Sequence, residues 1–133
     1  MQATGTFEVK IAPQAPDNDQ AKAAGLARLS LDKRFHGALE ATSQGEMLAD
    51  SGGGQQDGAY VAMERVSGTL DGREGGFVLV HRALMRGGTP QEWTVTVVPG
   101  SGTGALAGIE GAMTIAIENG RHDYAFEYAL PGQ

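Results

Sequence analysis

Two dipeptides, Asp71-Gly72 and Asn119-Gly120, each lie between two stretches in which apolar and polar residues alternate. Asp-Gly and Asn-Gly favour the type I′ turn of a two-residue β-hairpin, because both central residues of that turn need a positive φ angle. Alternation with a period of two is typical of a strand with one buried face. Each dipeptide therefore predicts a hairpin, and a two-residue turn fixes which residues of the two strands lie opposite each other.

The second of these hairpins has one face that is almost entirely apolar. Its register pairs Glu118 with Arg121, and residues two apart in each strand share a face. The apolar face carries Met113, Ile115, Ile117, Tyr124, Phe126 and Tyr128, with His122 near its end. Exposure of such an apolar face to water is unfavourable, so we expect the face to point into a core.

The first hairpin places an acid and a base together. Its register pairs Glu64 with Leu79 and Ala62 with His81. Glu64 and His81 are then diagonal neighbours on one face, at a Cβ separation of roughly 7 Å or less, which long side chains can span. An inward carboxylate beside an imidazole fixes the tautomer of the ring and can serve proton transfer. The alternative is a buried structural ion pair, since both settings perturb such groups.

The opposite face of this hairpin is also partly apolar, because Val61, Met63, Val78 and Val80 lie on it. A sheet that is apolar on both faces favours a closed barrel whose outer surface packs in an assembly. We therefore expect the chain to form a homo-oligomer.

The rest of the chain continues this β pattern. Alternation and turn residues predict strands over Ala3–Ile11, Leu26–His36, Ala38–Leu48, Ala59–Leu70, Arg73–Met85, Gln91–Val98, Gly111–Glu118 and Arg121–Leu130. Two longer connections interrupt them, Ala12–Gly25 with an Ala-rich end that can form a short helix, and the polar, Gly-rich loop Ala49–Gly58. Many short strands with regular turns indicate an all-β sandwich or barrel, and residues 1–133 show no boundary between domains.

Composition excludes several classes of function. The chain has 133 residues and a formal net charge of −6, and no basic cluster that would bind a nucleic-acid backbone. It has no Cys, which excludes disulfides and thiolate chemistry. No apolar run approaches the length of a membrane span and no secretory leader is visible. We expect a cytoplasmic protein with no nucleic-acid or membrane partner.

Neither a cofactor nor a metal is predicted. Gly102–Ala107, "GTGALA", fits a dinucleotide-binding pattern, but the sequence that follows alternates like a strand instead of forming the helix that such a site needs. A Gly-rich turn is the better interpretation. The three histidines, His36, His81 and His122, lack the close spacing that places two ligands on one face of an element.

The stretches "KRFHGALEATSQGEML", "GAYVAMERVSGTLDGREGGFVLVHRALM" and "TVTVVPGSGTGALAGIEGAMTIAIENGRHDYAFEYALP" carry a resemblance over nearly the whole chain. On these stretches the chain resembles the bacterial family called domain of unknown function 3224, which is similar to the allene oxide cyclase barrels. The resemblance implies an eight-stranded antiparallel up-and-down barrel, calycin-like, with a central cavity. Relatives in the wider superfamily include cyclases, which confine a reactive chain in an apolar cavity, and dirigent proteins. The resemblance carries no catalytic position of those cyclases over to a residue of this sequence.

Two functions follow as hypotheses. In the first, the barrel binds a small apolar molecule in its cavity and can isomerise or cyclise it, with Glu64 and His81 as candidate catalytic groups. The predicted ligand-binding residues are the aromatic side chains Tyr60, Phe77, Tyr124 and Tyr128. In the second, side chains fill the barrel, which is then a non-catalytic structural or assembly module. Small inward residues such as Ala62 and Ala83 leave room, which favours a cavity.

Overall fold

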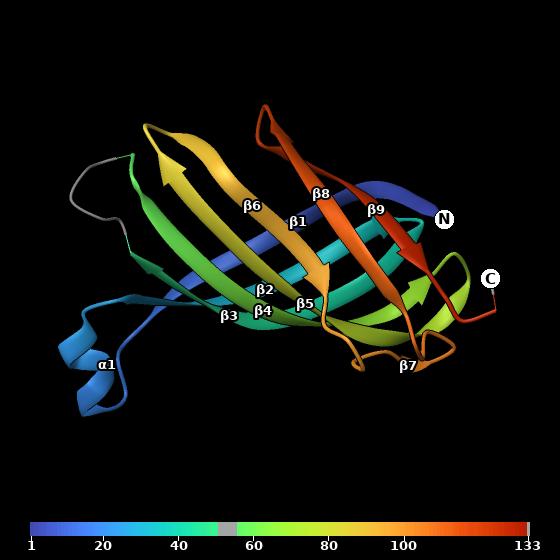
Figure 1. Cartoon of the computed structure of the whole chain (residues 1–133), viewed down its shortest axis with the longest axis horizontal. Helices are drawn as coiled ribbons and strands as arrows, with labels where there is room; N and C mark the ends of the chain where they lie inside the picture. The colour runs from blue at the N-terminus through green and yellow to red at the C-terminus, as the bar shows by residue number, and fades with distance from the viewer. Residues whose placement is uncertain (51–55, 133) are drawn as a thin grey trace.

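The computed structural model describes residues 1–50 and 56–132, and these form a closed barrel of eight antiparallel strands with one further short strand (Figure 1). The strands are β1 (Gln2–Gln14), β2 (Ala27–Gly37), β3 (Leu39–Asp50), β4 (Gly58–Leu70), β5 (Arg73–Arg86), β6 (Thr89–Val97), β7 (Thr103–Gly104), β8 (Glu110–Glu118) and β9 (Arg121–Ala129). Around the barrel the order is β4-β3-β2-β1-β9-β8-β6-β5, and pairing of β5 with β4 closes the ring. The predicted up-and-down barrel is confirmed.

Both predicted hairpins form in the predicted register. Asp71 and Gly72 have φ angles of 49° and 81°, and Asn119 and Gly120 have 52° and 78°, as a type I′ turn requires. In the β4–β5 ladder Glu64 lies opposite Leu79 and Ala62 lies opposite His81. In the β8–β9 ladder Glu118 lies opposite Arg121. Glu64 and His81 are therefore diagonal neighbours.

The connections also follow the sequence pattern. A short helix, α1 (Asp19–Ala24), begins after Asn18, whose side chain caps it by accepting a hydrogen bond from the Ala21 N–H, and ends at Gly25 in the left-handed conformation. Gly102–Ala107 forms β7 and turns, with no helix after it. Of the predicted loop Ala49–Gly58, residues 51–55 lie outside the described part of the chain.

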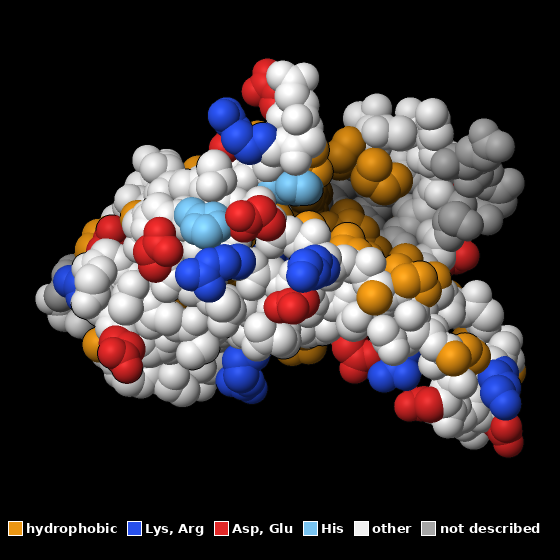
Figure 2. All heavy atoms as spheres, turned by 180° about the vertical axis from the view of Figure 1, so that it is seen from behind, with side chains coloured by type: hydrophobic (Ala, Val, Ile, Leu, Met, Phe, Trp, Pro, Cys, Tyr) orange, Lys and Arg blue, Asp and Glu red, His pale blue; other side chains and the backbone are white. Residues whose placement is uncertain are grey.

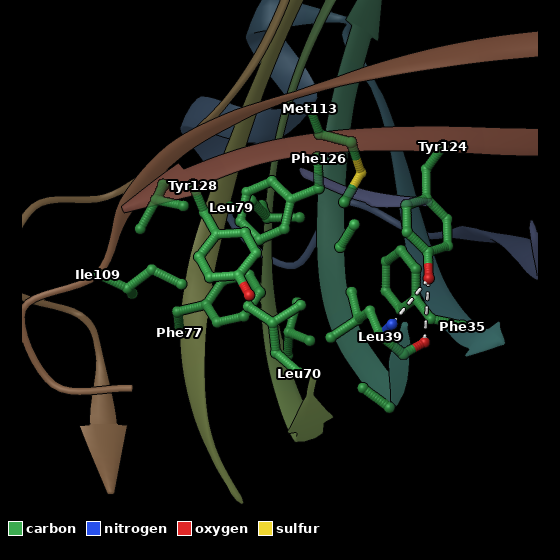
Figure 3. Packing of buried hydrophobic residues seen from close by; sticks show 14 of the residues in the cluster. Phe35, Leu39, Leu70, Phe77, Leu79, Ile109, Met113, Tyr124, Phe126 and Tyr128 are labelled. Carbon is green, nitrogen blue, oxygen red and sulfur yellow. Dashed lines mark hydrogen bonds between the residues drawn. The ribbon is translucent and has the colours of Figure 1, made fainter. Parts of the chain in front are cut away.

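One end of the barrel is filled by the hydrophobic core (Figure 3). Three aromatic rings stack there in a row, with centroid distances of 5.5 Å between Phe77 and Phe126 and 5.4 Å between Phe126 and Tyr128. Leu106 and Ile109, from the segment between β7 and β8, are fully buried against this core. We call this the closed end of the barrel.

The barrel wall is weakest between β6 and β8. These strands pair at one position only, Thr96 opposite Ala112. By contrast, β8 pairs with β9 along its whole length, from Glu110 to Glu118. The two strands therefore diverge on one side of this pair, toward the β5–β6 and β8–β9 hairpin turns (Figure 1).

Candidate functional site

A cavity of about 270 Å³ occupies the end of the barrel opposite the filled core. Its walls are mostly aliphatic, and Val9, Leu31, Met47, Ile115 and Ile117 are among the lining residues. Figure 2 shows hydrophobic side chains gathered in and around a hollow in the surface of the molecule. The apolar lining comes from alternate residues of β1, β2, β3 and β8, as the period of two in each strand dictates.

Glu64 is 1% exposed and does not line this cavity itself, but it bonds to Lys33 and His81, which do. Both of its carboxylate oxygens accept hydrogen bonds from neighbouring strands. Ser43 Oγ donates to Oε1 at 2.6 Å, and Lys33 Nζ donates to Oε2 at 2.8 Å. His81 Nε2 also bonds to Oε2. We call these four residues, Lys33, Ser43, Glu64 and His81, the buried polar cluster.

The partners of Glu64 keep its carboxylate ionised. Burial alone would raise the pKa of Glu64, because a low-dielectric interior disfavours charge. The hydrogen bond from His81 and the charge of Lys33 outweigh burial and lower the pKa to about 2. At neutral pH the cluster therefore holds a carboxylate anion against the Lys33 ammonium, in the paired form that burial of charge requires.

A glycine in β3 leaves the space in which this cluster forms. Gly45 faces inward directly opposite Glu64, and Ser43 lies opposite Lys33. Because both β3 positions are small, the long side chain of Lys33 from β2 reaches across β3 to Glu64 on β4. A Cβ atom at Gly45 would overlap the carbonyl oxygen of Met63 and crowd the Glu64 Cα atom.

His81 joins the buried polar cluster to the cavity. Its side chain lines the cavity, while its Nε2 atom is committed to Glu64. Among the described residues no partner bonds to its Nδ1 atom, so this nitrogen is available to a bound molecule. A carboxylate that fixes one imidazole nitrogen leaves the other poised to accept or donate a proton. The arrangement is thus capable of acid–base chemistry at the inner side of the cavity.

Three further side chains bring polar atoms to the cavity. Burial raises the pKa of the Tyr60 hydroxyl, and a hydrogen-bonding contact with the Trp93 N–H partly opposes this rise. Trp93 Nε1 is buried and makes no hydrogen bond of good geometry within residues 1–50 and 56–132. His122 packs on Phe7, with ring centroids 4.9 Å apart. Tyr60, Trp93 and His122 all line the cavity.

Comparison with known proteins places the chain in a family. The family model described as "Protein of unknown function (DUF3224)" matches residues 3–128. This chain belongs to the DUF3224 family. A solved structure of a DUF3224 protein of unknown function from Shewanella oneidensis MR-1 is 44% identical, with a TM-score of 0.87 over 98% of this chain and 97% of the other. No curated protein matches the chain.

The barrel of this DUF3224 protein separates the predicted ligand-binding aromatics. Tyr60 lines the cavity, whereas Phe77, Tyr124 and Tyr128 lie in the packed core of the closed end (Figure 3). The Tyr124 hydroxyl accepts a hydrogen bond from the Leu39 N–H and donates to the His36 carbonyl, both at 2.9 Å. These three aromatics face inward as predicted, but at the other end of the barrel from the cavity.

The polar ends of the core tyrosines serve the turns between strands. Tyr128 donates a hydrogen bond to Asp71 of the β4–β5 turn, and burial together with this carboxylate raises the pKa of Tyr128 to about 12. Gly5 in β1 has no side chain to obstruct the Tyr124 hydroxyl, which a Cβ atom there would approach to 2.6 Å. Both hydroxyls thus have structural partners in this DUF3224 protein.

Sequence reasoning missed Lys33 and Ser43 as members of the site, although a signal existed for Lys33. Lys33 lies two residues from Leu31 and from Phe35, so alternation places its side chain inward. A lysine at an inward position needs a buried acidic partner, and Glu64 is that partner. Its ammonium also lies 4.6 Å from the centroid of the Phe7 ring.

His36 lies on the outer surface, where Nε2 bonds to Glu8 at 2.8 Å. Within the described residues no group of three or more His, Cys, Asp or Glu side chains could hold a metal ion. No described helix of this DUF3224 protein is long and apolar enough to cross a membrane.

Proposed function

We propose that this protein binds a small, largely apolar molecule in the cavity at the open end of the barrel. The observation that carries this proposal is an apolar cavity of about 270 Å³ that ends at the buried polar cluster. A dry apolar cavity of about 150 Å³ is large enough for benzene, so this one is large enough for a ring with a short side chain. Pockets for small molecules combine apolar walls with a few oriented polar groups in this way.

The polar end of the cavity supports proton transfer as the class of reaction. His81 is oriented by Glu64 and keeps Nδ1 free, so it is the candidate catalytic group, with Glu64 as its positioning residue. Isomerisation or cyclisation of a bound molecule needs only such a group and a shaped cavity. The combination of an apolar cavity and one acid–base group fits the sequence resemblance to the allene oxide cyclase barrels, in which an apolar cavity confines a reactive chain.

Thermal unfolding with small probes tests binding. Indole, 3-phenylpropanamide and 3-phenylpropionate form a suitable panel. At a free concentration tenfold above its dissociation constant, a probe that binds only the folded state stabilises it by about 1.4 kcal/mol. For a domain of this size that corresponds to a rise in Tm of roughly 3–6 °C.

Matched variants show whether the probes occupy the cavity. Ala62 lines the cavity, and Ala62→Leu should fill part of it and abolish the shift. Ala116 is exposed on the outer face of β8, so Ala116→Leu should keep the shift. Absence of a shift with all three probes, or an equal shift in both variants, would contradict binding in the cavity.

A second candidate function, assembly through the outer face of the barrel, has its own observation. Val61 and Met63 on β4 are 50% and 52% exposed. They line an outer groove together with Leu48 and Val80. A contiguous apolar surface of this kind favours contact with another protein surface, and a second copy of the chain is the occupant we propose.

A further inference from the structure

We infer that the molecule held in the cavity is a small apolar acid, a carboxylic acid or acidic phenol, whose anionic oxygen binds between His81 and Trp93. This inference rests on the proposed binding function and adds the chemical class of the ligand. It follows from which polar groups line the cavity and from which of their hydrogen-bonding atoms are already engaged.

The polar groups that line the cavity are all able to donate a hydrogen bond. They are Lys33, Tyr60, His81, Trp93 and His122. None of the described lining residues is Asp or Glu. The contrast with the whole chain is large, because the chain has 16 acidic and 10 basic residues. The interior of an acidic protein thus presents ammonium, imidazole, indole and phenol groups, a set that complements an anion and disfavours a cation.

The carboxylate of Glu64 is already committed to three donors and does not line the cavity. Ser43 occupies Oε1 of Glu64, and Lys33 and His81 share Oε2. An amine ligand would therefore find no free acidic oxygen at the inner side of the cavity. The charges of Lys33 and Glu64 cancel. The Nδ1 atom of His81 can take up the proton of an acidic ligand, and the ligand oxygen then pairs with the imidazolium that this transfer forms.

Trp93 provides a second donor for the same oxygen. Its Nε1 atom is buried and lies beside the Tyr60 hydroxyl, but among the described residues it forms no hydrogen bond of good geometry. Buried donors are nearly always well paired in folded proteins, so a poorly satisfied donor that lines a cavity indicates an acceptor supplied by a ligand. Trp93 of β6 lies opposite Ala83 of β5, and Ala83 is two residues from His81 on the same strand. The side chains of Trp93 and His81 both line the cavity. One ligand oxygen can thus lie near both groups, because an indole and an imidazole are long side chains.

Calorimetric titration with three molecules of one shape tests this inference. The probes are 3-phenylpropionate, 3-phenylpropanamide and 3-phenylpropylamine, which differ in having an anionic, a neutral or a cationic end. With the full chain at pH 7 and constant ionic strength, the acid should bind at least tenfold more tightly than the amide. The amine should bind most weakly of the three.

Two variants assign the preference to the proposed atoms. His81→Gln should reduce the ratio of acid to amide affinity at least fivefold. Trp93→Phe keeps an aromatic ring and removes the N–H, so it should weaken binding of the acid at least threefold and leave binding of the amine unchanged. Trp93 lies outside the buried polar cluster, so this second variant gives an answer even if His81→Gln does not fold. The matched control is His36→Gln, because His36 pairs with Glu8 on the outer surface.

Other outcomes of the titrations would contradict the inference, the proposed binding function, or the assignment to His81 and Trp93. If the three probes bind within twofold of one another, or the amine binds best, the inference fails while the proposed binding function stands. If no probe binds and indole gives no thermal shift, the proposed function fails as well. A preference for the acid that persists in both His81→Gln and Trp93→Phe, or that disappears equally in His36→Gln, overturns the assignment to these two side chains.

Discussion

At the scale of single residues, Glu64 organises the interior of the barrel. It is an ionised carboxylate that folding removes from water, and three donors from three strands compensate for the lost hydration. Because the pKa of Glu64 in the folded protein lies at about 2, below its ordinary value, the folded state gains stability whenever the group is ionised. That stabilisation is present above the ordinary pKa of about 4.3 and is lost as the pH falls through the folded pKa.

We expect the contribution of Glu64 to appear as acid sensitivity. Between pH about 4.5 and about 2 the wild type should lose on the order of 3 kcal/mol of unfolding free energy through this group. At pH 7, Glu64→Gln should destabilise the fold by about 3–5 kcal/mol, because Lys33 stays buried without its counter-charge. Urea unfolding at a series of pH values measures both effects.

Two further variants separate the cluster from general acid effects. The double variant Lys33→Met with Glu64→Gln should recover part of the stability at pH 7 and lack the loss between pH 4.5 and 2, since it removes both charges together. Glu127→Gln, at an exposed position of β9, should follow the wild type throughout. A single variant Glu64→Gln as stable as the wild type would contradict the buried pair.

Single residues also show what sequence can and cannot predict about the site. Register gave the contact between Glu64 and His81, because a two-residue turn fixes every opposite pair along the hairpin. Alternation also gave the inward orientation of Phe77 and Tyr128. It does not give position along the barrel axis, since that depends on the stagger of all eight strands. For that reason these two aromatics were expected at the cavity and lie at the closed end.

At the scale of elements, β3 is the strand on which the cluster depends. Its inward positions beside Lys33 and Glu64 are Ser43 and Gly45, and a larger side chain at either would separate the acid from the base. The glycine also allows close approach of the neighbouring strand, as glycines inside strands often do. The sequence shows the glycine, but its reason becomes visible only when the neighbouring strands are in place.

We expect Gly45→Ala to destabilise the protein by about 1–3 kcal/mol or more, because the new Cβ atom overlaps the backbone of β4 and neither strand can shift without disturbing its other ladder. Chemical denaturation measures the change. Thr42→Ala, at an exposed position of the same strand, is the control and should stay within about 0.5 kcal/mol of the wild type. Equal effects of the two substitutions would show that the close approach at Gly45 has no energetic role.

At the scale of the whole molecule, the barrel combines the two interiors that the sequence presented as alternatives. Side chains fill the closed end, and a cavity lies at the other end. The eight strands, both type I′ turns and the short helix were predicted because each has a local signal in the chain. The short strand β7 and the burial of Leu106 against the closed end were not, because they depend on contacts between distant segments.

Assembly is also a property of the whole molecule, and the outer face of β4 makes it testable. If a second copy covers Val61 and Met63, sedimentation velocity should show a dimer or larger species for the wild type. Val61→Glu should then give a monomer that still binds the cavity probes, because this side chain points away from the interior. A wild type that stays monomeric at high concentration would exclude the assembly candidate.

The separation of the closed end from the cavity has a consequence for how such proteins diverge. Substitution of Tyr60 changes the lining of the cavity without removing any side chain from the buried core around Phe77 and Phe126, whereas Trp93 lines the cavity and also packs against that core. The relative from Shewanella oneidensis differs at more than half of its aligned positions and keeps the same barrel. If the proposed binding function holds, ligand preference can therefore diverge in this family while the barrel is kept, because several residues that line the cavity belong neither to the buried core nor to the buried polar cluster.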